Sequence, residues 1–180
     1  LPACAPMQSP KPSRFFSWKE VWQLPAAVIL AVVCVDQWTK YLVVTSATLM
    51  RDGAIEIIPD FFSIVRVHNT GAAWGLFSDH AAILTCISAI VFIGMAVLFS
   101  RFTEGHAERG LAVSLILGGI AGNFIDRLGR VDGVVDFLCF YYRQWQWPSF
   151  NVADSCICIG VGFYCLSTVL RPRAEPEKEI

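Results

Sequence analysis

The sequence has few charged residues for its length. Only 16% of its 180 residues are charged, whereas soluble domains carry about 25%. Lys and Arg number 14 against 15 for Asp and Glu, so the formal net charge is −1. No run of basic residues alternates with aromatic residues, which is the pattern typical of nucleic-acid-binding surfaces. We therefore expect no nucleic-acid partner.

The sequence also lacks the ligand spacings of a metal centre. It has 3 His, and most of its 7 Cys lie in apolar runs, where Cys packs as a small hydrophobic residue. The cysteines in such runs are Cys34, Cys86, Cys156, Cys158 and Cys165. No neighbouring His or Cys completes a zinc spacing with Cys156 and Cys158. Neither a metal ion nor an organic cofactor is expected.

Hydrophobic residues, in contrast, make up 55% of the chain, and the mean hydropathy is +0.54. A membrane helix needs about 20 mostly apolar residues. Four runs meet or approach that length: residues 24–44, 81–99, 110–127 and 151–170. No small-residue cleavage site follows the first run, so we expect it to be a membrane span and not a signal peptide. The sequence predicts a mainly α-helical membrane protein with four transmembrane helices.

Four spans place three short basic segments on one side of the membrane. These segments are residues 1–23, 100–109 and 171–180. Cytoplasmic segments carry an excess of Lys and Arg. We therefore expect a cytoplasmic N-terminal extension (1–23) and a cytoplasmic tail (171–180). Residues 24–170 then form a single integral-membrane domain.

Two longer segments face the outer side. Residues 45–80 are rich in β-branched and aromatic residues, broken by Pro59 and Gly71, which indicates a small unit of short strands and turns. Residues 128–150 include Trp145 and Trp147, whose amphipathic rings favour the lipid headgroup layer. We expect this second segment to form an amphipathic helix or loop, with both Trp side chains contacting lipid.

Polar residues gather at the outer ends of three spans. Residues three or four apart share a helix face. The residues concerned are Asp36 and Lys40 in the first span, Asn123, Asp126 and Arg127 in the third, and Asn151 and Asp154 in the fourth. An Asp within a span costs about 2.5–3.5 kcal/mol on insertion scales and indicates a functional site. In the third span, Gly118 and Gly122 form a small-residue pair that predicts close packing on a neighbour.

Two carboxylates at one site can share a proton. Such a pair can deprotonate a water and protonate a leaving group, which is the chemistry of aspartic proteolysis. Asp154 is one expected member of the pair. From the residues alone, its partner is Asp126, Asp132 or Asp136.

Five motifs occur in order along almost the whole chain. They are "DQWTK" (36–40), "NTGAAWG" (69–75), "GGIAGNFIDR" (118–127), "VVDF" (134–137) and "FNVADS" (150–155). Together they resemble the lipoprotein signal peptidase family, the bacterial signal peptidase II. The resemblance implies four transmembrane helices, a β-cradle after the first and an amphipathic outer segment before the last.

The resemblance also implies that Asp136 and Asp154 form a catalytic dyad. The implied supporting residues are Asp36, Lys40, Asn69, Gly119, Asn123, Asp126, Arg127, Asn151 and Ala153. The implied enzyme is an aspartic endopeptidase of the bacterial cytoplasmic (inner) membrane, with its active site near the outer leaflet. Its substrates would be prolipoproteins with a diacylglyceryl-modified lipobox Cys, cleaved just before that Cys. Family members are sensitive to cyclic peptide inhibitors such as globomycin, and we expect a monomer.

Two functions from other classes compete with this interpretation. A small proton-coupled transporter or channel would use the intramembrane Asp and Lys residues as a relay, but it should carry polar residues at several membrane depths. A structural subunit of a membrane assembly would leave the paired aspartates unexplained. The one-sided position of the polar cluster favours the peptidase.

Overall fold

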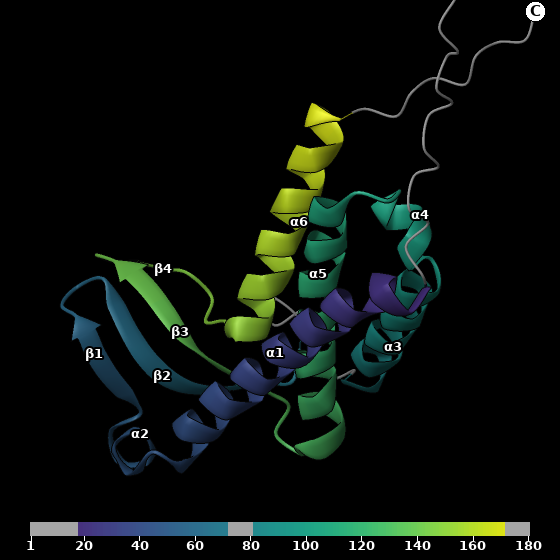
Figure 1. Cartoon of the computed structure of the whole chain (residues 1–180). Coiled ribbons are helices and arrows are strands. Elements are labelled where there is room, and N and C mark those ends of the chain that lie inside the picture. The colour runs from purple at the N-terminus through teal and green to yellow at the C-terminus, as the bar shows by residue number, and fades with distance from the viewer. Residues whose placement is uncertain (1–17, 72–80, 172–180) are drawn as a thin grey trace, which may run out of the picture.

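The computed structural model describes residues 18–71 and 81–171 (Figure 1). In chain order, the elements are α1 (Trp18–Thr45), α2 (Ala47–Asp52), β1 (Ala54–Ile58), β2 (Phe62–Asn69), α3 (Ala81–Val97), α4 (Phe99–Thr103), α5 (Ala107–Gly129), β3 (Val134–Tyr142), β4 (Trp145–Gln146) and α6 (Val152–Leu170). Most of the predicted N-terminal extension, nearly all of the predicted tail and the end of the "NTGAAWG" motif lie outside the described residues.

Three helices of the described chain are long and apolar enough to cross a membrane. They comprise the Gln23–Thr45 part of α1, α5 and α6. The apolar helix α3 is shorter, and it continues almost directly into α4, where the Phe102 amide donates to the Leu98 carbonyl. The chain is therefore a multi-pass membrane protein, and a fourth span through α3 stays a prediction.

Helix α5 lies at the centre of the helical part and packs against α1, α3, α4 and α6. Its glycines allow these close approaches. A Cβ atom at Gly118 would lie 2.7 Å from the Cβ of Val32 in α1, and one at Gly119 would collide with the Ala153 carbonyl oxygen in α6. Small residues let membrane helices approach closely. The close packing predicted for the third span is confirmed.

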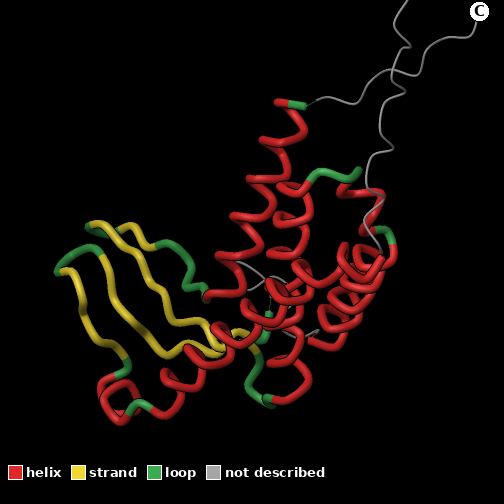
Figure 2. Tube along the Cα trace, in the orientation of Figure 1, coloured by secondary structure: helices red, strands yellow, loops and turns green. Residues whose placement is uncertain are grey.

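The four strands form one antiparallel sheet in the order β1-β2-β3-β4, beside the end of α1 and the start of α6 (Figure 2). Along the β2–β3 pair, Val67 lies opposite Asp136 and Asn69 lies opposite Val134. A bulge between Ile64 and Val67 shifts the register of this pair. The sheet thus connects the two segments, residues 45–80 and 128–150, that are predicted to face the outer side.

Of the helix or loop expected for residues 128–150, the helix is wrong. After the end of α5, this segment, described throughout, contains strands β3 and β4 and no amphipathic helix. The run "VVDFLCFYY" is rich in β-branched and aromatic residues, which favour strands. Strand β2 supplies the hydrogen-bonding edge on which this run pairs. The short helix α2, capped by the Ser46 side chain, is likewise absent from the sequence-based expectation for residues 45–80.

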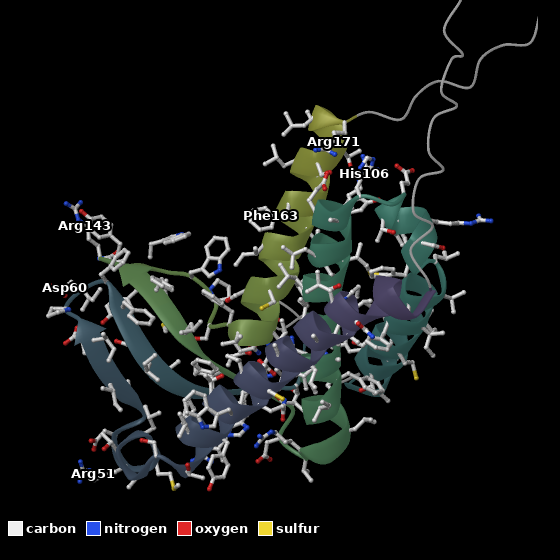
Figure 3. All side chains as sticks on the ribbon, viewed as in Figure 1. Arg51, Asp60, His106, Arg143, Phe163 and Arg171 are labelled. Carbon is white, nitrogen blue, oxygen red and sulfur yellow. The ribbon has the colours of Figure 1, made fainter. Side chains whose placement is uncertain are left out.

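A buried Arg links the helices at the end of the helical part that lies opposite the sheet. Arg109 of α5 is 3% exposed; it donates to Ser167 Oγ at 3.2 Å and to the Arg171 carbonyl at 2.7 Å, and forms an ion pair with Glu104. These contacts fasten the end of α6 to the α4–α5 turn. In Figure 3, His106 and Arg171 mark this end, far from Asp60 at the sheet.

Candidate active site

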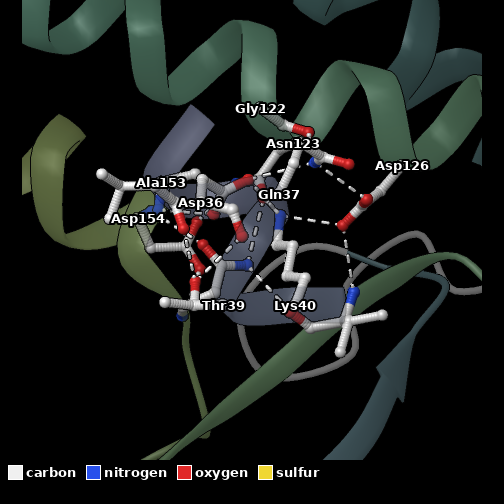
Figure 4. Close-up of polar contacts among 12 residues, drawn as sticks. Asp36, Gln37, Thr39, Lys40, Gly122, Asn123, Asp126, Ala153 and Asp154 are labelled. Carbon is white, nitrogen blue, oxygen red and sulfur yellow. Dashed lines mark hydrogen bonds and ion pairs between the residues drawn. The ribbon is translucent and has the colours of Figure 1, made fainter. Parts of the chain in front are cut away.

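The site is built around a buried Lys on α1. The Lys40 ammonium lies 2.8 Å from Asp36 Oδ2, 2.8 Å from Asp126 Oδ2 and 2.9 Å from Asn123 Oδ1 (Figure 4). An ammonium group has three donor hydrogens, so these contacts satisfy it. Lys40 and Asp36 are both 0% exposed. The structure thus brings together the polar faces that the sequence places on the first and third spans.

The two carboxylates of this ion cluster also hold backbone amides. Asp36 Oδ1 accepts from the Ala153 amide at 3.0 Å, and Asp126 Oδ2 accepts from the Val135 amide at 3.3 Å. Ala153 directly precedes Asp154, and Val135 directly precedes Asp136. The cluster of Asp36, Lys40 and Asp126 therefore fixes both segments that carry the candidate catalytic carboxylates.

Asp154 lies in the first turn of α6, where it forms a capping box with Asn151. Asn151 Oδ1 accepts from the Asp154 amide at 2.9 Å, and Asp154 Oδ2 accepts from the Asn151 amide at 3.2 Å. Asn123 Nδ2 donates to Asp154 Oδ1 at 2.7 Å. The start of a helix stabilises a carboxylate through its free amides and its macrodipole. These contacts hold both oxygens of the Asp154 carboxyl in place.

Asp136 lies on β3 and is 3% exposed. Asn151 Nδ2 donates to its Oδ1 at 2.7 Å, and Asn69 Nδ2 donates to its Oδ2 at 3.0 Å. Burial raises the pKa of Asp136 to about 6; the hydrogen bonds from Asn69 and Asn151 oppose this rise, and the charge of Asp154 adds to it. Asp136 can therefore keep its proton to a higher pH than an ordinary Asp.

Both aspartates open onto one cavity of about 320 Å³. Its polar lining includes Asn69, Asn123 and Arg127, and its apolar lining is Ile87, Val91, Ile120, Val134 and Ile157. Arg127 Nη1 lies 3.5 Å from Ser88 Oγ on α3. The cavity thus combines two carboxylates, amide donors and a guanidinium with aliphatic side chains. This combination suits acid–base chemistry on a substrate that is partly apolar.

The structure separates the three possible partners of Asp154. Asp126 is held by Lys40 and 1% exposed, and Asp132 is exposed in the turn before β3; of the three, Asp136 lines the cavity. Trp145 lies on β4 and Trp147 directly follows that strand; they are 63% and 45% exposed and do not line this cavity. Their ring centroids are 5.7 Å apart.

Sequence reasoning missed two polar residues of the site. Gln37 Nε2 reaches Asp126 Oδ1 at 3.1 Å, and Ser88 contributes to the cavity wall. Gln37 lies three residues before Lys40 in the motif "DQWTK", so the rule that residues three or four apart share a face was the available signal for it. Ser88 is a hydroxyl within an apolar span, which was the available signal. Within the described residues, no group of three or more His, Cys, Asp or Glu is placed to hold a metal ion.

Membrane helices arranged around a cavity that two carboxylates line indicate a membrane enzyme. A solved structure described as a bacterial membrane enzyme, obtained by the in meso method at 2.3 Å resolution, is similar to it with a TM-score of 0.74. The two share 33% sequence identity over 87% of this chain and 94% of that chain. A second such structure, at 1.9 Å, gives a TM-score of 0.70.

The family follows from sequence comparison. The family model for signal peptidase (SPase) II matches residues 28–170. The lipoprotein signal peptidase of Symbiobacterium thermophilum is 42% identical over 82% of this chain and 96% of its own length. That of Bacillus subtilis is 40% identical over 74% of this chain and 85% of its own length. The chain belongs to the signal peptidase II family, which confirms the resemblance seen in the five motifs.

Proposed function

We propose that this chain is an intramembrane aspartic endopeptidase that removes the signal peptide from diacylglyceryl-modified prolipoproteins. The observation that carries the proposal is the pair Asp136 and Asp154, which open onto one cavity and are bridged by Asn151. Family membership supports the substrate class, because relatives are named lipoprotein signal peptidases. Cleavage would occur just before the lipidated Cys of the lipobox.

In the proposed mechanism, Asp154 begins as the carboxylate and Asp136 as the acid. Asp154 takes a proton from a water as the water oxygen attacks the carbonyl carbon that precedes the lipidated Cys. The carbonyl oxygen then carries the negative charge. Arg127, which lines the cavity, is placed to stabilise this oxyanion.

The second step breaks the peptide bond. Asp136 donates its proton to the nitrogen of the lipidated Cys, and the carbon–nitrogen bond cleaves to release a free amine and a carboxyl terminus. Asp154 now holds the proton taken from water, and its transfer to Asp136 restores the pair. A bound lipidated substrate excludes water, which raises the pKa of Asp136 further and keeps its proton in place at neutral pH.

The apolar side chains around the cavity suit a substrate anchored by acyl chains. We place the site near the outer leaflet of the bacterial inner membrane, with both termini cytoplasmic. The Trp145 and Trp147 pair would contact lipid headgroups at the surface of that leaflet. A cyclic peptide inhibitor such as globomycin would compete for the same cavity. The enzyme would act as a monomer, because both aspartates come from one chain.

Cleavage by the purified, lipid-reconstituted protein tests the proposal. The diacylglyceryl-modified precursor should yield a mature fragment that begins at the lipidated Cys, as mass spectrometry would show. The same precursor without the diacylglyceryl group should be cleaved far more slowly, because it lacks the chains that seat it. Equal cleavage of both forms would contradict the proposed substrate class, and cleavage of neither would contradict the proposed activity.

An infrared titration of the substrate-free protein tests the protonation of Asp136. Because burial raises the pKa of Asp136 to about 6, its carboxyl should be protonated at about pH 5, where an ordinary Asp is ionised. The carboxylic-acid carbonyl band should disappear as the pH rises through that pKa. It should be missing from Asp136→Asn and present in Asp132→Asn, its exposed neighbour. A band that titrates identically in Asp136→Asn would assign the proton elsewhere.

A further inference from the structure

We propose that Gln37 is a positioning residue for catalysis, which orients the Asp126 carboxylate and through it the strand that carries Asp136. This inference rests on the two-aspartate mechanism proposed above. Gln37 is distinct from the residues that the motif resemblance assigns to the site, and it does not line the cavity.

The side-chain amide of Gln37 joins α1 to α5. Its Nε2 lies 3.1 Å from Asp126 Oδ1, 3.1 Å from the Gly122 carbonyl and 3.2 Å from Asp36 Oδ2 (Figure 4). An amide nitrogen has two hydrogens, so three acceptors share two donors. Gln37 is therefore the neutral cross-link between the same two carboxylates that Lys40 joins by charge.

The two oxygens of Asp126 have different tasks. Oδ2 accepts from Lys40 and from the Val135 amide, while Oδ1 accepts from Gln37 and from Arg130 Nε at 3.0 Å. Donors on both oxygens set the rotation of the carboxylate plane, and this rotation decides whether Oδ2 meets the Val135 amide. Removing the Gln37 donor leaves Arg130, a partly exposed side chain, as the remaining partner of Oδ1 in the described structure.

Val135 transmits this orientation to the candidate catalytic carboxyl. Its amide is held by Asp126, its carbonyl accepts from Asn151 at 3.3 Å, and Asn151 also donates to Asp136 at 2.7 Å. A small shift of β3 lengthens the hydrogen bonds that Asp136 receives. The other charges near Asp136 are those of Asp154 on α6, Lys40 on α1 and Arg127 on α5, and Gln37→Met changes none of them.

The test compares Gln37→Met with Thr39→Val in the reconstituted full chain. Met is similar in length to Gln but has no amide. Thr39 lies in the same turn, and its hydroxyl donates to carbonyls of its own helix, so Thr39→Val removes a polar group that does not contact Asp126. Gln37→Met should lower kcat roughly ten-fold, since remote misplacement of reacting groups slows catalysis, and leave KM within about two-fold. The infrared midpoint of Asp136 should move upward, because weaker hydrogen bonds stabilise its charge less. Thr39→Val should match wild type.

Wild-type kcat and midpoint in Gln37→Met, with or without a lower melting temperature, would overturn the proposal. If Gln37→Met does not fold, Gln37→Asn withdraws the amide from Asp126 by one methylene and changes no charge. An upward midpoint in that variant supports the proposal, and an unchanged midpoint overturns it. Parallel assays of Asp136→Asn and Asp154→Asn separate the two hypotheses: if both are inactive and Gln37→Met is normal, only the role of Gln37 fails.

Discussion

Replacing either Asp136 or Asp154 with Asn is expected to lower kcat by about 10²–10⁴-fold or more. Asn matches Asp in size but cannot take or give a proton. The mechanism needs one carboxylate and one carboxylic acid at the same time, so a single change removes it. Cleavage of the diacylglyceryl-modified precursor by each purified variant measures the loss.

The matched control is Asp132→Asn, which changes an exposed carboxylate close to Asp136 in sequence and should cleave at the wild-type rate. Folding is checked by thermal melting in detergent. Asp154→Asn keeps an oxygen that can accept from the Asn151 amide, so the start of α6 should survive. Turnover near wild type in either dyad variant, or an inactive Asp132→Asn protein, would refute the assignment.

The second large effect is expected on stability. Lys40→Met should lower the free energy of unfolding by about 3–5 kcal/mol, the range seen when one partner of a buried ion pair is removed. Asp36 and Asp126 would be left 0% and 1% exposed without the ammonium that lies 2.8 Å from each. Chemical or thermal unfolding in a lipid-like detergent provides the measurement.

A surface ion pair provides the comparison. Arg51 and Asp52 form a pair whose side chains are 77% and 46% exposed, so Arg51→Met should leave the free energy of unfolding almost unchanged. Adding Asp36→Asn and Asp126→Asn to Lys40→Met should recover part of the lost stability, because the cluster of Asp36, Lys40 and Asp126 then holds no buried charge. If Lys40→Met and Arg51→Met were equally stable, the buried cluster would have no special structural role.

Hydropathy and residue spacing predict the long helices and the buried polar cluster, for physical reasons. A long apolar run satisfies its backbone hydrogen bonds in a membrane by forming an α-helix. Helices α1, α5 and α6 are therefore found where the sequence predicts them. Short polar side chains within those runs cannot reach water, and they therefore have to meet one another. The cluster of Asp36, Lys40, Asn123 and Asp126 follows from that argument.

The features that the sequence does not predict depend on contacts between segments that are distant in the chain. Residues 134–142 become a strand because β2, far away in sequence, offers an edge to pair with. The separation of Asp126 from Asp136 depends on Lys40 binding the former, and spacing within one helix cannot show this. The amides of Val135 and Ala153 anchor the site through main-chain atoms, which carry no side-chain signature.

The ion pair within α1 has a consequence for biogenesis. Asp36 and Lys40 are one turn apart on the same helix, and their charged atoms lie 2.8 Å from each other. Each charge alone would oppose partitioning of a nascent helix from the translocon into lipid by roughly 2.5–3.5 kcal/mol. Paired within one turn, they can enter as a neutral unit before α5 has been synthesised. The first span can therefore insert into the bilayer first, and Asp126 completes the cluster when α5 later packs against it.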